Sequence, residues 1–152
     1  MALSAKTFNR FMFFKLPAAW WCGVRLRSLN GDQAVCTVTH RWINQNPFRS
    51  MFWAVQGMAA EFATGALVMY HIRDSGQPVS MLVLNNKANF SKKATGRIRF
   101  TCTDGREVRE AVERAVASGK GQTVWMRSVG TNTEGVVVST FDFEWTLKVK
   151  GA

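Results

Sequence analysis

Apolar and polar residues alternate in several short runs of this chain, a pattern typical of strands that bury one face. Residues 140–150 are the clearest case, because apolar residues occupy every second position from Phe141 to Val149 and polar residues stand between them. Other runs predict strands over residues 24–29, 33–40, 79–85, 97–103 and 122–129. The sequence therefore predicts an antiparallel sheet of about five or six strands.

The first two predicted strands are separated by Asn30-Gly31. This pair favours a type I′ hairpin turn, which needs positive φ at both central residues. We therefore expect the chain to begin its sheet with a hairpin.

A different pattern covers residues 46–72, where most positions are apolar or small. Asn46 followed by Pro47 is typical of an N-cap and a first helical position, so we expect a helix over 46–72. Its only charged residue between Met51 and Tyr70 is Glu61. A helix that is apolar on nearly every side must be enclosed, so the sheet is expected to wrap around it.

A surface helix is predicted over residues 104–118. Asp104 and Glu107 have the spacing of a capping box, a stripe of valine and alanine follows, and Gly119 provides a stop. We expect this helix to cover one edge of the sheet.

The N-terminal residues 1–22 predict a helical segment that packs on the rest of the domain. Cations stand beside aromatic residues between Phe8 and Trp21, a composition also found in interfacial membrane anchors, which is the alternative use of this segment. No linker or repeat divides the chain, so residues 1–152 are expected to form a single α+β domain.

Charge narrows the range of partners. The 152 residues include 20 Lys and Arg against 10 Asp and Glu, a formal charge of +10, which favours nucleic acid, a membrane surface or the phosphates of a coenzyme. A solvated basic face explains the same excess. The three cysteines have no CxxC spacing and the two histidines have no companion ligand, so we expect a reducing cytoplasm and no metal site.

Glu61 is the sharpest chemical signal in the chain. A carboxylate among apolar residues of an enclosed helix is costly unless it is paired or has a function. A solvent gap or an arginine partner would explain it without chemistry. Function is the competing interpretation, because groups with perturbed pKa values gather at active sites.

The stretch from His40 to Ala66, with Asn85-Asn86-Lys87-Ala88-Asn89-Phe90, resembles an uncharacterised branch of the hotdog superfamily, a domain of unknown function, over nearly the whole chain. The fifteen residues from Asn46 to Glu61 are similar in spacing to acyl-CoA thioesterases of the phenylacetyl-CoA type. The resemblance implies the hotdog fold, in which a curved antiparallel sheet wraps one long helix. It also implies a homodimer or a tetramer, with the site between subunits.

The resemblance implies roles for particular residues. In that family an acidic residue acts on the thioester as general base or nucleophile, and a backbone N–H near the helix start stabilises the oxyanion. Carried over, Glu61 takes the first role, and the N–H of Trp53 or Ala54 takes the second. Asn46 is a further catalytic candidate, which could orient water or the thioester carbonyl. The family's His-Gly-Gly is replaced here by Phe52-Trp53-Ala54.

Further polar residues are expected to bind substrate. They lie on the predicted helix and along the basic segment after it, which would attract the phosphates of coenzyme A. The candidates are Gln56, Thr64, Asn85, Asn89, Lys92, Lys93 and Arg97. Capping by Asn46, hydrogen bonds from Gln56 and Thr64 to neighbouring strands, and a solvated basic face explain the same residues without substrate.

Three functions remain open from the sequence. The first is an acyl-CoA thioesterase without cofactor other than the coenzyme A of its substrate. The second is a non-catalytic protein that binds an acyl group or another hydrophobic ligand. The third is a basic protein that docks on membrane lipid or nucleic acid, although no nucleic-acid module accompanies the charges and nucleic acid is not expected.

Overall fold

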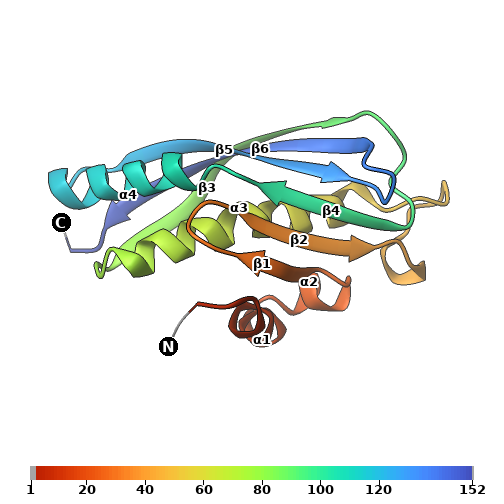
Figure 1. Ribbon diagram of the computed structural model, residues 1–152, viewed down its shortest axis with the longest axis horizontal. Coiled ribbons are helices and arrows are strands. Elements are labelled where there is room, and N and C mark those ends of the chain that lie inside the picture. Colours follow the sequence, from red (N-terminus) through yellow and green to blue (C-terminus); the bar gives the residue numbers. More distant parts are fainter. Residues whose placement is uncertain (1–2, 152) are drawn as a thin grey trace.

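A curved antiparallel sheet wraps around one long helix in a computed structural model of the protein, which describes residues 3–151 (Figure 1). The elements, in chain order, are α1 (Ala5–Lys15), α2 (Pro17–Trp21), β1 (Arg25–Leu29), β2 (Ala34–Thr39), the 3-10 turn η1 (Trp42–Asn44), α3 (Trp53–Asp74), β3 (Val79–Phe90), β4 (Arg97–Cys102), α4 (Gly105–Ser118), β5 (Gln122–Thr131) and β6 (Val137–Val149). This is the α+β hotdog arrangement that the sequence predicts. No helix within residues 3–151 combines the length and the hydropathy needed to cross a membrane.

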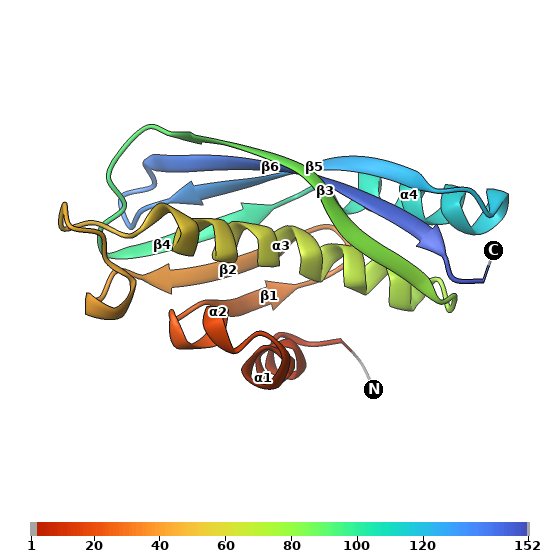
Figure 2. The ribbon, with the colours of Figure 1, turned by 180° about the vertical axis from the view of Figure 1, so that it is seen from behind.

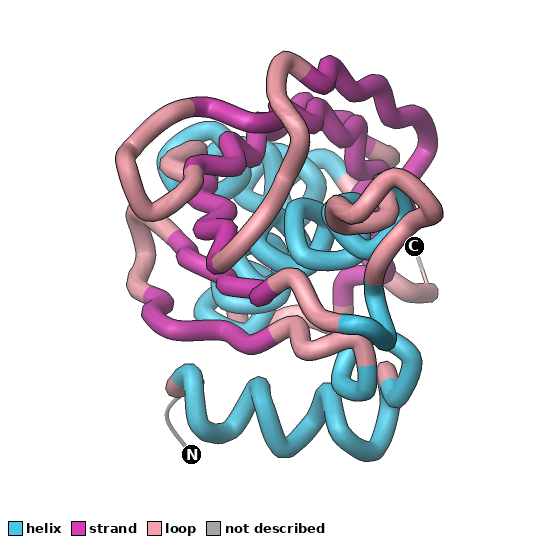
Figure 3. Tube along the Cα trace, turned by 90° about the vertical axis from the view of Figure 1, so that its right-hand side faces the viewer, coloured by secondary structure: helices cyan, strands magenta, loops and turns pink. Residues whose placement is uncertain are grey.

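The six strands lie in the order β1-β2-β4-β5-β6-β3, so β1 and β3 are the two edges. Strand β3 is longer than expected and continues from Asn85 to Phe90, because it pairs with β6 from Val79↔Val149 to Phe90↔Ser139. Figure 2 shows α3 along the concave side of the sheet, with β3 crossing over its C-terminal half. Figure 3 shows α1 outside the arch of strands.

Helix α3 begins at Trp53, so the prediction of a helix start at Asn46 is wrong. The Asn46 side chain instead accepts hydrogen bonds from the backbone N–H groups of Phe48 (2.9 Å) and Ser50 (3.2 Å). This local turn uses the amide that would have capped a helix, a competition to which asparagine is prone. The Met51 N–H then donates to the Ala94 carbonyl at 2.8 Å, which ties the loop to the segment after β3.

The hairpin between β1 and β2 is confirmed, but its type I′ turn is not. Within the described chain the only non-glycine residue with positive φ is Arg49, and Gly31 also lacks positive φ. Asn30 closes a longer turn by accepting from the N–H groups of Asp32 and Gln33 at 2.8 and 2.9 Å. The Gly31 carbonyl bonds to Nε2 of the buried His71 at 2.7 Å, so this turn is shaped by a tertiary contact.

Helix α4 confirms the predicted surface helix, and Gly119 ends it in the left-handed conformation. The prediction of a capping box is wrong, because the Asp104 side chain makes no cap hydrogen bond. Its carboxylate accepts the Arg127 backbone N–H at 2.7 Å. Strands β4 and β5 pair only from Thr101↔Val129 to Arg99↔Thr131, so the β5 amide of Arg127 has no β4 partner and takes the carboxylate instead.

The core lies between α3 and the inner face of the sheet. Two aromatic residues of β6 approach glycines of α3, since a Cβ at Gly57 would lie 3.5 Å from the Phe141 ring and one at Gly65 would lie 3.3 Å from the Trp145 ring. The Trp145 indole N–H donates to the buried Thr64 hydroxyl at 3.0 Å. On the other side, Phe8 of α1 packs edge-on against Phe62 of α3.

The start of α4 packs so closely against the β1–β2 turn that only glycine fits. A Cβ at Gly105 would collide with the backbone of Gly31 and Asp32, which cannot move without breaking the His71 contact. We predict that Gly105→Ala lowers the free energy of unfolding by about 1–3 kcal/mol in urea titrations. Gly121→Ala is the control, because this site is exposed and a Cβ there would meet only the Leu147 carbonyl, at 4.0 Å. An equal loss in both variants would contradict this explanation.

Candidate functional site

The first turn of α3 presents unpaired backbone donors. Its N-cap is Phe52, which has no side-chain cap hydrogen bond. The N–H groups of Val55 and Gln56 reach the Phe52 carbonyl at 3.0 and 3.3 Å, but those of Trp53 and Ala54 find no acceptor among residues 3–151. Free N–H groups at a helix start carry partial positive charge, so this turn can bind an anion or a polarised carbonyl oxygen.

The same turn lies in an open cleft of about 560 Å³. Its walls come from the loop before α3, the first turn of α3 and the segment after β3. The lining residues are Asn46, Pro47, Phe48, Ser50, Met51, Phe52, Trp53, Gln56, Phe90, Ser91, Lys92, Lys93 and Ala94. Lys93 Nζ donates to the Phe48 carbonyl at 3.4 Å and so links the two loops. The cleft thereby brings together five of the residues singled out from the sequence, Asn46, Trp53, Gln56, Lys92 and Lys93.

Gln56 is the buried polar group of this cleft. It is 4% exposed, its Nε2 makes a long 3.5 Å contact with the Met51 carbonyl, and its Oε1 has no hydrogen-bond partner in the described chain. A buried amide oxygen without a partner is costly. It is therefore ready to accept a hydrogen bond from a molecule in the cleft.

Four of the candidate substrate-binding residues lie outside the cleft, and Ala54 is not among its lining residues. Thr64 is buried and uses its hydroxyl in the core, where it accepts from Trp145 and donates to the Glu61 carbonyl at 2.9 Å. Asn85 donates to Glu144 at 3.1 Å on the outer face of the sheet. Asn89 lies beside Lys87 and Arg127, and Arg97 is exposed at the start of β4.

Glu61 lies eight residues beyond Trp53 on α3, about 12 Å along the helix axis. It is half-buried, and its carboxylate accepts no hydrogen bond from any residue between 3 and 151. Burial raises its pKa to about 6. A carboxyl group with this pKa changes ionisation close to neutral pH, the range that suits a general base.

A row of aromatic side chains runs from the cleft towards Glu61. Trp53, Gly57 and Glu61 follow one another at i, i+4 and i+8, and Phe141 packs on the helix at Gly57, where a Cβ would lie 3.5 Å from its ring. Phe90 of the cleft packs edge-on against Phe141 at 5.5 Å. Phe141 stacks on Phe143 at 6.0 Å, and Trp145 follows on the same face of β6.

The sequence pattern predicts only that these aromatic residues belong to the core. Alternation along β6 identifies the face they share, but not that this face runs beside Glu61. The glycines opposite them, Gly57 and Gly65, were the available signal, because glycine inside a helix is unfavourable unless a neighbour needs the space.

Relatives identify the family. The sequence profile of a family described as "Domain of unknown function (DUF4442)" matches residues 4–147. The chain belongs to this family. No curated protein is similar enough to count as a match.

Solved structures similar to this DUF4442 protein share its hotdog fold at low sequence identity. A Chlorobaculum tepidum protein of unknown function has a TM-score of 0.83 and 18% identity, with 96% of this chain and 94% of that chain covered. A Pseudomonas aeruginosa protein described as a probable thioesterase has a TM-score of 0.82 and 21% identity, with 98% of each chain covered. A Haemophilus influenzae thioesterase has a TM-score of 0.74 and 12% identity, with 100% and 95% covered.

The raised pKa of Glu61 predicts a pH-dependent effect of Glu61→Gln on stability. Below the ordinary pKa of 4.5 the residue is protonated in both the folded and the unfolded chain, so the variant matches the wild type. As the pH rises through about 6 the unfolded chain ionises first, and the wild type loses stability. Above that pH, Glu61→Gln is expected to be more stable by about 1–2 kcal/mol.

Urea titrations of both proteins from pH 4 to 8 measure this difference. Glu113→Gln, which removes a carboxylate from the exposed side of α4, is the matched control. A stability difference for Glu61→Gln that does not change with pH would refute the burial of the charge.

Proposed function

We propose that this DUF4442 protein hydrolyses acyl thioesters, with acyl-CoA as the substrate class. The observation that carries the proposal is the uncapped first turn of α3, whose Trp53 and Ala54 N–H groups are free beside a cleft lined largely by apolar groups. Solved structures described as thioesterases share the fold, which supports the proposal without assigning any residue.

The free N–H groups suit the carbonyl oxygen of a thioester. When water attacks the carbonyl carbon, this oxygen gains a full negative charge, and donors already fixed by a helix stabilise it without reorganisation. The tetrahedral intermediate then expels the coenzyme A sulfur, which leaves as a thiol after gaining a proton. The products are a carboxylic acid and free coenzyme A.

Glu61 is proposed to take the proton from the attacking water. It cannot do so at the N–H groups of its own chain, because about 12 Å of helix separates the two. A second copy of the chain resolves this separation if Glu61 of the partner subunit faces the first turn of α3. The site is then composite, and a homodimer is part of the mechanism.

The free edge of the sheet supports the homodimer. Strand β3 is hydrogen bonded on one side to β6 and is an edge on the other, and it exposes Leu82 (67%) and Leu84 (52%). Long edge strands with exposed apolar residues favour pairing with another strand. On α3, Ala54, Met58 and Glu61 form a half-buried stripe that a second copy would cover.

The lysines at the cleft are proposed to hold the phosphates of coenzyme A. Lys92 and Lys93 are exposed, and both line the cleft. Ammonium groups attract phosphates and form charge-assisted hydrogen bonds with them.

A non-catalytic acyl-binding protein is the second candidate. It is favoured by the Trp53 indole, which is 57% exposed in the cleft at the position where the resemblance to phenylacetyl-CoA-type thioesterases implies glycine. In this alternative the ligand binds, but no hydrolysis follows.

Two substitutions of Trp53 test the contributions of its backbone N–H and of its indole side chain separately. Phe52 has φ −59° and ψ 132°, the conformation that a residue before proline prefers, and Trp53 is the first helical position, where proline is tolerated. We predict that Trp53→Pro, which lacks the N–H, lowers kcat about 100- to 1,000-fold, while Trp53→Ala keeps kcat within a few fold. Acyl-CoA hydrolysis measured with a thiol reagent tests this, and equal loss in both variants would exclude the oxyanion role.

Mixed dimers test the composite site with the same proteins. Glu61→Gln alone is expected to lose about 100- to 10,000-fold in activity. When Glu61→Gln and Trp53→Pro chains are unfolded together and refolded, each mixed dimer holds one intact site, so about a quarter of wild-type activity returns. No recovery means that both groups act from one chain, and binding of acyl-CoA without hydrolysis by the wild type favours the second candidate.

A phosphate-binding role for the lysines predicts a change in KM alone. Lys92→Ala with Lys93→Ala is expected to raise KM for acyl-CoA about tenfold and leave kcat unchanged, because the phosphates lie far from the reacting carbon. Acyl-pantetheine, which lacks the nucleotide phosphates, should show no change. Arg106→Ala with Arg109→Ala on α4 is the control for net charge, and an equal effect there would contradict a local role.

A further inference from the structure

The first two helices carry a surface that neither the fold nor the proposed active site uses. Helix α1 turns Phe8 and Met12 inward, where both are buried. Its opposite side and α2 leave cations and large aromatic residues exposed, with Phe14 at 70% and Trp21 at 66%. We call this surface the N-terminal face; it consists of Lys6, Arg10, Phe13, Phe14, Lys15 and Trp21.

The aromatic residues of the N-terminal face form a raised, ordered ridge. Phe13 packs edge-on against Phe14 at 5.0 Å and against Trp20 at 5.4 Å. The Arg25 guanidinium lies 3.4 Å over the Trp20 ring. These contacts hold the base of the ridge in place, so the exposure of Phe14 and Trp21 does not come from a loose helix.

The surroundings of the ridge are positive without compensation. Asp32 is the first acidic residue of the chain, while Lys6, Arg10, Lys15, Arg25 and Arg27 all precede it. None of these five cations forms a salt bridge in residues 3–151, where the ion pairs are Arg106–Glu107 and Arg127–Asp142. Burial, then the charges of Arg41 and Arg27, lower the pKa of Arg25, as expected where positive charges gather.

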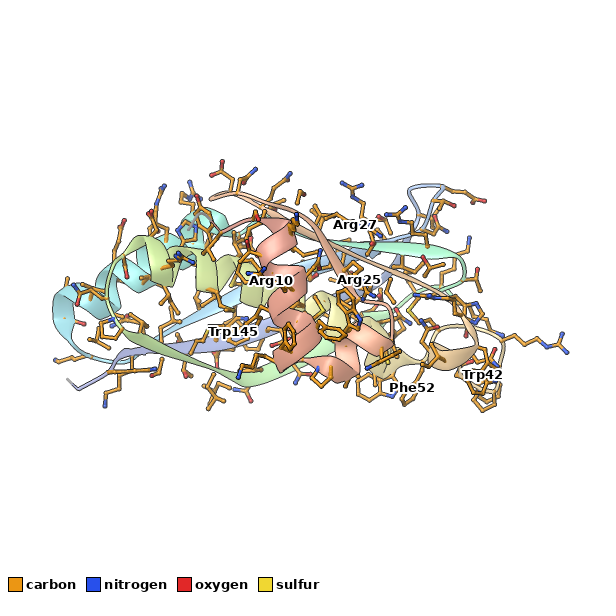
Figure 4. The ribbon with its side chains drawn as sticks, turned by 90° about the horizontal axis from the view of Figure 1, so that it is seen from below. Arg10, Arg25, Arg27, Trp42, Phe52 and Trp145 are labelled. Carbon is orange, nitrogen blue, oxygen red and sulfur yellow. The ribbon has the colours of Figure 1, made fainter. Side chains whose placement is uncertain are left out.

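Helix α1 and strand β1 bring these charges to one side of the molecule. The Asn9 side chain donates to the Leu26 carbonyl at 2.9 Å and accepts from the Leu26 N–H at 2.8 Å, so α1 is fixed against β1 at this point. Figure 4 shows Arg10 of α1 with Arg25 and Arg27 of β1 in the view from below. Strand β3 is the opposite edge of the sheet, so dimerisation there leaves the N-terminal face open.

We propose that the N-terminal face docks the protein on an anionic lipid bilayer, with its aromatic residues in the interfacial region and its cations against the lipid phosphates. Aromatic side chains favour the membrane interface, and each basic residue near an anionic surface adds to binding. A second copy is a poorer occupant, because two-fold symmetry would set these unpaired cations against themselves. Nucleic acid favours a groove that follows its backbone, whereas this face lies on a helix outside the arch of strands (Figure 3).

Vesicle co-sedimentation tests the proposal with the full chain. Wild-type protein is expected to bind vesicles of phosphatidylcholine with phosphatidylglycerol, to ignore phosphatidylcholine alone, and to dissociate at high salt. Lys6→Gln with Arg10→Gln should weaken binding roughly 30-fold, about 5-fold for each basic residue. Arg109→Gln with Arg114→Gln on α4 makes the same change in net charge and should leave most of the binding intact.

The aromatic ridge is tested separately. Phe14→Ser with Trp21→Ser should abolish the quenching of tryptophan emission by brominated lipid tails, while Trp125→Ser, at an exposed site on β5, should preserve it. Equal binding to neutral and anionic vesicles, or equal losses in the α4 variant, would overturn the proposal. Binding to an oligonucleotide but not to vesicles would also overturn it. So would a change in the mass of the dimer that occurs only in the variants of the N-terminal face, because that result would make the face a contact between copies of the chain.

Discussion

Helix α3 and strand β6 are in close contact at two glycines of the helix. Gly57 and Gly65 stand where Phe141 and Trp145 press on the helix, and the Trp145 indole is anchored to Thr64 by a hydrogen bond. Because a buried indole N–H needs an acceptor, Thr64 fixes the ring and the ring fixes the spacing. The position of the helix relative to the sheet follows from these contacts, and with it the position of Glu61, one turn before Gly65.

The first turn of α3 has backbone N–H groups that no residue between 3 and 151 accepts from. Most helices satisfy their first N–H groups with a Ser, Thr, Asp or Asn cap, but Phe52 offers none. Asn46 could have supplied one, yet its amide closes the turn before Ser50. Asn46 therefore stabilises the loop instead of capping the helix, and the N–H groups of Trp53 and Ala54 remain free at the cleft. A helix end without a cap is expected where a ligand completes it.

Much of this structure can be read from the sequence, and the errors share one cause. Periodicity predicts the strands, the enclosed helix and α4. Burying a whole face of an element requires apolar residues at many regularly spaced positions, and a single tertiary contact does not change that pattern. The errors fall on Asn46, Asn30-Gly31 and Asp104, where a short polar side chain has several possible partners. Asn46 and Asn30 accept from backbone amides of their own turns, which are held by tertiary contacts with Ala94 and His71, and Asp104 accepts from an amide of β5 that has no β4 partner.

The candidate site shows the same division. Glu61 could be identified because an isolated charge among apolar residues is conspicuous in any helix. The cleft could not be identified, since its walls come from two segments far apart in the sequence, around residues 46–56 and 90–94. In the fold these segments are joined by the hydrogen bond between Met51 and Ala94, the contact of Lys93 with Phe48 and the edge-on packing of Trp53 against Phe90. The charge of Lys92 and Lys93 makes them candidates in the sequence, but it does not place them at the cleft. Their position depends on the full length of β3, which continues to Phe90, whereas the sequence pattern predicts a strand that ends at residue 85.

A composite site would also answer the energetic question that Glu61 raises. In one chain its ionised form is penalised by burial and has no hydrogen-bond donor, and covering the helix with a second copy would increase that penalty. A partner that brought the uncapped start of α3 to the carboxylate would set a partial positive charge against it. The two unsatisfied features of the fold, free N–H groups and an unpaired carboxylate, are therefore complementary. Substrate and water between them would separate the charges just far enough for each to act on the thioester.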